Sequence, residues 1–191
     1  KIIQINYFND NDKNIDIFLN YLKKNKKKPK IINDINYSII SPYKKYNQKK
    51  EKLILIYFSK INKNFLKKIL KEISKNFRNY KIVLNSKEIL NKISKEKLNS
   101  NFFLKSKNKN INFYLNKAQI LISGGGLLSL EATRYNVKNI VIYSNYFQEV
   151  NSFYLMKKNL IAFRLDYRTL KIIDFVKKIR ILCKTKKVFN K

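Results

Sequence analysis

The three glycines of this chain are consecutive, at positions 124–126, and its 191 residues contain no other glycine. Residues 119–122 (Gln-Ile-Leu-Ile) precede them and predict a strand, whereas residues 127–136 predict a helix. Glycine lets a backbone turn sharply because it has no Cβ. In a chain so poor in glycine, the run marks a position where another residue is not tolerated. The sequence therefore predicts a strand, a tight turn and a helix at this place.

Strand and helix patterns alternate along the rest of the chain after residue 50. Residues 53–58 form a continuous apolar run, which is typical of a strand buried on both faces. Apolar residues then recur at helical spacing over residues 61–77. We expect further strands at residues 80–84, 101–104, 119–122, 139–143 and 161–165, and helices after Ser86 and at residues 111–117, 127–136, 147–157 and 168–183. This alternation predicts an α/β fold with a parallel, doubly wound sheet.

The first fifty residues have a different character. Ile2, Ile3 and Ile5 predict a strand, and residues 14–22 a short helix. A lysine run ending at Pro29, a strand-like stretch at residues 35–40 and a polar loop at residues 44–52 follow. We interpret residues 1–50 as the tail of a preceding domain with its linker, and residues 51–191 as the main domain.

Histidine is absent and Cys183 is the single cysteine of the chain. The chain therefore has no intrachain disulfide, no histidine-based catalytic triad and no cysteine–histidine zinc site. We expect neither a metal nor a cofactor, and we assign no catalytic residue.

The formal net charge of +31 raises the question of nucleic-acid binding. Glycine, proline and alanine are scarce whereas lysine, asparagine and isoleucine are abundant, which is the pattern of AT-rich codons. Five of the 43 basic residues are arginine, although arginine reads phosphates and bases better than lysine. We therefore do not expect a nucleic-acid partner, and keep a basic nucleic-acid-binding module as an alternative. No apolar run is long enough to cross a membrane and no signal peptide is visible, so we expect a cytoplasmic protein, and because the chain starts at Lys1 it could be partial.

The glycine segment carries the chemistry that the sequence makes visible. A helix that starts directly after glycines presents unpaired N–H groups and a positive dipole end to an anion. Ser123 and Ser129 could add hydroxyl donors to a phosphate, and Glu131 lies about one turn into the helix, where a carboxylate can accept bonds from a ribose diol. Arg134 and Lys138 could balance the charge of a diphosphate.

Residues 111–148 resemble the glycine–glutamate block of the GT-B superfamily, and within it the UDP-sugar hydrolases of pseudaminic acid biosynthesis. Weaker resemblance runs through residues 2–19, 33–43 and 53–70. It implies the Rossmann-like C-terminal half of a two-domain GT-B architecture with a UDP-sugar as partner. It also implies roles for the residues of the block: Gly124, Gly125 and Gly126 contact phosphate or uridine, Glu131 the ribose, and Gln148 the sugar or diphosphate.

The chain also departs from this family. The family's first glycine loop falls at residues 57–60, where no glycine is present. Its catalytic histidine belongs to the N-terminal domain, and this chain has none. We therefore expect an N-terminal domain to be missing and the chain to be inactive alone. Two related hypotheses stay open: a UDP-sugar glycosyltransferase domain, related to the lipid II-forming N-acetylglucosaminyltransferase, and a degenerate homologue that binds nothing.

Overall fold

The structure is a computed structural model. It describes residues 3–5, 17–19, 31–32, 49–59, 61–84, 102–104 and 111–185. The chain divides into two compact units, Lys1–Pro42 and Tyr43–Lys191. The assignment of residues 1–50 to a preceding domain and linker stays a prediction.

The first unit contains a parallel three-stranded sheet. Its strands, in the order β1-β2-β3, are β1 (Ile3–Ile5), β2 (Ile17–Leu19) and β3 (Ile31–Ile32). The predicted first strand is confirmed, but the helix predicted at residues 14–22 is wrong, since this segment supplies β2. A short apolar run does not distinguish helix from strand, and here the pairing with β1 and β3 decides. The lysine run and residues 35–40 lie outside the described residues.

The second unit is built on a parallel six-stranded sheet in the order β6-β5-β4-β7-β8-β9. The strands are β4 (Leu53–Tyr57), β5 (Lys81–Leu84), β6 (Phe102–Leu104), β7 (Ile120–Ser123), β8 (Lys138–Tyr143) and β9 (Phe163–Asp166). All six coincide with predicted strands. The prediction of an α/β fold with a parallel sheet is confirmed.

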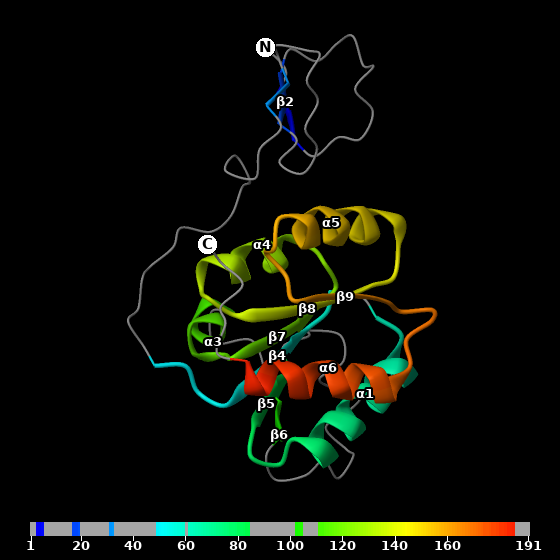
Figure 1. The fold of residues 1–191 in the computed structure, drawn as a ribbon. Helices are drawn as coiled ribbons and strands as arrows, with labels where there is room; N and C mark the ends of the chain where they lie inside the picture. The colour runs from blue at the N-terminus through cyan, green and yellow to red at the C-terminus, as the bar shows by residue number, and fades with distance from the viewer. Residues whose placement is uncertain are drawn as a thin grey trace. The chain divides into compact units, whose positions relative to one another are not determined.

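Helices cover both faces of this sheet (Figure 1). They are α1 (Lys63–Asn76), α3 (Ile111–Lys117), α4 (Leu127–Arg134), α5 (Tyr146–Lys157) and α6 (Ile172–Lys184). α1 and α6 pack on one face, whereas α4 and α5 lie on the other. The helix predicted after Ser86 lies outside the described residues.

The buried strand β4 shows how the sequence specifies these layers. Ile54 and Ile56 belong to the core beneath α1 and α6, whereas Leu53 and Leu55 belong to the core beneath α3 and α4. Successive residues of a strand point to opposite faces, and helices cover both faces here, so all four side chains are buried. Each stabilises the fold by roughly 1.5–3 kcal/mol relative to an exposed side chain.

The C-terminal helix is predicted from residue 168 but begins at Ile172. Asp166 explains the difference. Its carboxylate accepts the backbone N–H of Arg168 at 2.9 Å and the Arg168 guanidinium at 2.7 Å. These bonds hold residues 166–168 in a turn after β9.

The strand order places a switch point between β4 and β7. The chain builds β4, β5 and β6 outward on one side, then returns to start β7 next to β4 and continues outward on the other side. In such sheets the ligand binds in the crevice outside the carboxyl ends of the strands at the switch point. Tyr57 and Ser123 are paired in register at that edge.

Candidate nucleotide site

The glycine loop (Gly124–Gly126) lies at this switch point, because it directly follows the last residue of β7. The loop after β8 leads into α5 and brings Gln148 next to the glycine loop. Predicted site residues from the glycine loop and from the first turn of α5 thus lie together at the carboxyl edge of the sheet.

Gly125 is a glycine that the fold itself requires. Its φ of +79° lies in the left-handed region, which residues other than glycine rarely adopt. A Cβ at this position would also lie 2.9 Å from Cγ1 of Val141 and 3.3 Å from the backbone oxygen of Gln148. Both the backbone conformation and the available space therefore exclude a side chain.

Gly124 packs between two side chains. A Cβ there would lie 3.4 Å from Nε2 of Gln148 and 3.5 Å from Cδ1 of Phe58. Phe58 is buried and directly follows β4, Gly124 directly follows β7, and Gln148 lies in α5, the helix that follows β8. The contact shows that the amide group of Gln148 faces the glycine loop.

Gly126 differs from its two neighbours. Its backbone (φ −83°, ψ −163°) is accessible to any residue, and a Cβ would meet nothing within 4 Å. It is also the N-cap of α4, where it offers no side chain to the first helical N–H groups. Nothing in the fold requires glycine here.

Ser123 and Ser129 form a buried hydrogen-bonded cluster with Asn139. The two Oγ atoms lie 2.8 Å apart, and the Ser123 hydroxyl donates to Oδ1 of Asn139 at 3.2 Å. All three residues are buried. With the Ser123 proton directed at Asn139, Ser129 becomes the donor to Ser123. These bonds join the elements beneath the loop. The role of Ser123 and Ser129 as phosphate donors stays a prediction, and the bonds within the cluster do not favour it, because they already use both hydroxyl protons.

Gln148 is held by the start of α5. Its Oε1 accepts the backbone N–H of Ser144 at 2.9 Å and the Ser144 hydroxyl at 3.0 Å. Its own backbone N–H donates to the side chain of the N-cap Asn145 at 2.9 Å. Because the oxygen is fixed in this way, the –NH₂ group of Gln148 is the part that faces the loop.

Two further predicted residues, Glu131 and Arg134, lie on α4, the helix that follows the glycine loop. Glu131 is partly buried on α4, about one turn after the glycine loop, and already takes part in an interaction within the chain. Arg134 is exposed at the other end of α4. Besides these predicted residues, the start of α5 exposes two aromatic rings, Tyr146 and Phe147, with centroids 6.0 Å apart.

The suggestion that Lys138 balances a diphosphate is wrong. Lys138 is the first residue of β8, at the opposite edge of the sheet from the glycine loop, and is buried. Its Nζ donates to the backbone oxygens of Leu182, at 2.7 Å, and Thr185. These carbonyls end α6, where a cation is favoured by the helix dipole. Burial lowers the pKa of this ammonium group.

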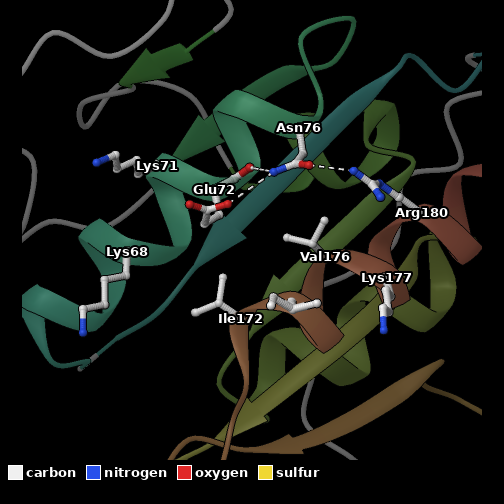
Figure 2. Close-up of a pocket in the computed structure, with 9 residues that line it drawn as sticks. Lys68, Lys71, Glu72, Asn76, Ile172, Val176, Lys177 and Arg180 are labelled. Atoms are coloured by element: carbon white, nitrogen blue, oxygen red, sulfur yellow. Dashed lines mark hydrogen bonds between the residues drawn. The ribbon is translucent and has the colours of Figure 1, made fainter.

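Two hollows of the surface lie away from the glycine loop. One, of about 550 Å³, is lined by residues of α1 and α6 (Figure 2). The other, of about 360 Å³, adjoins the turn between β9 and α6. Among the residues that the structure describes, no three cysteine, aspartate or glutamate side chains are close enough to hold a metal ion. None of the described helices is long and apolar enough to cross a membrane.

No protein-family profile and no curated protein matches the chain. Solved structures do match. The glycotransferase of kitacinnamycin has a TM-score of 0.67 at 15% identity, over 92% of this chain and 48% of its own. The spinosyn rhamnosyltransferase SpnG has a TM-score of 0.65 at 11% identity, over 90% and 49%. LpCGTa in complex with UDP has a TM-score of 0.54 at 11% identity, over 75% and 35%.

The chain has a Rossmann-like α/β fold that matches half of GT-B glycosyltransferases. It spans about half the length of the first two of these proteins. SpnG has also been solved in complex with thymidine diphosphate. The predicted GT-B half is thus confirmed as a fold, and nothing in these likenesses singles out the hydrolases of pseudaminic acid biosynthesis.

Three residues of the site were missed in the sequence. Phe58 and Val141 contact the glycines from neighbouring strands, and Asn139 holds Ser123. Asn139 carried a usable signal, because it is a polar residue at the start of an apolar strand and a buried polar group needs a partner. Phe58 and Val141 look like any other core residue in the sequence.

Proposed function

We propose that the glycine loop binds the diphosphate of a UDP-sugar, and that the chain is the nucleotide-sugar-binding portion of a GT-B enzyme. Gly126 is the observation that carries this proposal. The fold explains Gly125 by its backbone conformation and its close neighbours, whereas a Cβ at Gly124 would make ordinary van der Waals contacts and one at Gly126 would meet nothing within 4 Å. In a chain with three glycines, a glycine facing open space is expected where a ligand approaches the backbone closely.

The surroundings of Gly126 suit an anion. The helix that it caps has no acidic residue in its first turn. The N–H of Ser129 already donates to the backbone oxygen of Gly126 at 2.9 Å. The N–H groups that precede it at the start of a helix have no carbonyl partner within the helix, and together with the dipole they attract negative charge. In the proposed complex, phosphate oxygens accept these N–H groups, and the –NH₂ group of Gln148 donates from the other side of the loop. Glu131, further along the same helix, accepts from the ribose hydroxyls.

For the whole enzyme we favour glycosyl transfer over sugar-nucleotide hydrolysis. The glycotransferase of kitacinnamycin and the rhamnosyltransferase SpnG share this fold, and SpnG and LpCGTa have been solved with thymidine diphosphate and UDP respectively. This chain spans about half of the first two, and it has no histidine to act as a base near neutral pH. We therefore propose that a second domain supplies the acceptor site and the base, and that this chain binds without turnover.

Calorimetric titration of the chain with UDP, uridine and inorganic diphosphate tests the proposal. We expect UDP to bind in the micromolar to millimolar range, more tightly than either of its parts. A chain that is folded but indifferent to UDP, and that binds RNA with an affinity falling steeply with salt, would support the nucleic-acid alternative instead.

A further inference from the structure

A groove of about 550 Å³ runs between α1 and α6, on the face of the sheet opposite to α4 and α5. Ile172, Ile173 and Val176 of α6 give it an apolar lining. Ile173 is 71% exposed, which is unusual for an isoleucine, whereas Phe175, Val176, Ile179 and Leu182 of the same helix are buried. The groove thus joins apolar surface to a concave shape.

Most of the charged side chains around this lining are positive. Lys68 and Lys71 extend from α1, and Lys177 and Arg180 from α6, while Glu72 is the single carboxylate among the lining residues. Lys177 lies 3.8 Å from Asp174, with both side chains largely exposed, so this pair neutralises the groove only weakly.

One end of the groove is closed by a fixed network that joins the two helices (Figure 2). Nη2 of Arg180 donates to Oδ1 of Asn76 at 2.7 Å. Nδ2 of Asn76 donates to the backbone oxygen of Glu72 at 2.9 Å and to its carboxylate at 3.4 Å. The network holds the guanidinium of Arg180 at the rim, where its remaining N–H groups can bind an incoming carboxylate.

We propose that this groove is a docking site for an acidic peptide segment of a partner protein, with carboxylates on either side of one or two aliphatic side chains. The apolar lining receives the aliphatic side chains, and the lysines and Arg180 pair with the carboxylates. A concave groove with charge on both walls matches a peptide better than the flat surface of a membrane. This site is separate from the glycine loop and does not depend on the nucleotide proposal.

The test must separate the groove from the high positive charge of the whole chain. The probe is a fluorescein-labelled peptide of alternating glutamate and leucine pairs, titrated by anisotropy against the full chain. The double variant Lys68→Glu/Lys177→Glu changes one residue on each wall. The control, Arg134→Glu/Lys157→Glu, makes the same change of net charge at exposed positions of α4 and α5.

We expect the groove variant to weaken peptide binding about tenfold or more, and the control to change it less than about twofold. Ile173→Ser should also weaken binding. Ile181→Ser should not, because Ile181 is also exposed on the same helix but lines the neighbouring hollow. All four variants should keep the far-UV circular dichroism spectrum and the urea-unfolding midpoint of the unmodified chain, which reports that they are folded.

Equal losses in the groove variant and its control would overturn the proposal, since binding would then follow overall charge. It would also be overturned if phosphatidylserine vesicles or poly-uridine RNA, rather than the peptide, showed the selective dependence on Lys68, Lys177 and Ile173.

Discussion

The hydroxyl oxygens of Ser123 and Ser129 lie 2.8 Å apart in the buried space beneath the glycine loop. One residue ends β7 and the other lies in the first turn of α4, so their bond joins the two elements that the loop connects. Asn139 of β8 completes the cluster by accepting from Ser123. The loop therefore rests on a polar support, although apolar side chains surround it.

Replacing Ser123 with alanine should destabilise the chain by about 1–3 kcal/mol, because it leaves buried polar groups of Ser129 and Asn139 without their partner. Urea unfolding measures the loss. The exposed Ser59 provides the control, since Ser59→Ala removes a hydroxyl outside the buried cluster. A Ser123→Ala variant as stable as Ser59→Ala would show that the cluster contributes nothing.

Replacement of Gly125 with alanine should destabilise the chain strongly, whereas replacement of Gly126 should change its stability little. At Gly125 the left-handed backbone costs about 1–2 kcal/mol, and the overlap with Val141 costs roughly 1–3 kcal/mol more. At Gly126 the added methyl group points into open space, so we expect a change within about 0.5 kcal/mol. Thermal unfolding of the two variants side by side measures the difference. Similar stabilities would contradict the observed geometry of the loop.

Gln148→Glu tests which end of this side chain meets the ligand. A glutamate keeps an oxygen that accepts from Ser144 but replaces the –NH₂ group facing the glycine loop with negative charge. We expect UDP affinity to fall about tenfold, or 1.4 kcal/mol, with little loss of stability. Gln119→Glu is the matched control at the amino end of the same sheet, before β7. If both variants bind UDP equally well, Gln148 does not contact the diphosphate.

Lys50 should make stability depend on alkaline pH. Its Nζ donates to the backbone oxygen of Leu115 at 2.8 Å, and burial lowers the pKa of the ammonium group to about 8. Between pH 8 and about 10.4 the unfolded chain binds more protons at this lysine than the folded chain, so its contribution to the free energy of unfolding rises with pH.

Lys50→Met should remove that contribution. Burial raises the pKa of Cys183, which acts in the opposite direction over part of the same range. The informative quantity is therefore the difference in free energy of unfolding between the unmodified chain and the variant, measured by urea unfolding at several pH values. A difference that stays constant from pH 8 to 10 would show that Lys50 titrates normally in the folded state.

Long periodic elements of the second unit were predictable, whereas short segments and contacts across strands were not. The stripe of α1 follows the helical period over 14 residues, so its type is clear. The apolar run Leu53–Tyr57 shows no period, but its short length and its β-branched and aromatic residues favour a strand. β2 has three residues, too few to show a period, and its strand conformation depends on pairing with its neighbours.

The candidate site could likewise be predicted only in part. The glycine loop and its place after a strand could be predicted, because glycines between a strand and a helix have a direct physical meaning. The internal bonds of Ser129 could not, because they depend on how α4 packs back onto the end of β7. The position of Lys138 at the far edge was available in the sequence, because it precedes the strand predicted at residues 139–143 of a parallel sheet. Side chains adjacent to a motif in the sequence can point to opposite edges of the sheet.

The most direct test of the account is the calorimetric affinity of UDP for the unmodified chain and for Gly126→Val. The structure places the new side chain in open space, so the variant should fold with nearly unchanged stability. If a diphosphate approaches the backbone at Gly126, the isopropyl group occupies its place and UDP binding should be lost. A stable Gly126→Val variant that binds UDP as tightly as the unmodified chain would contradict the proposed site.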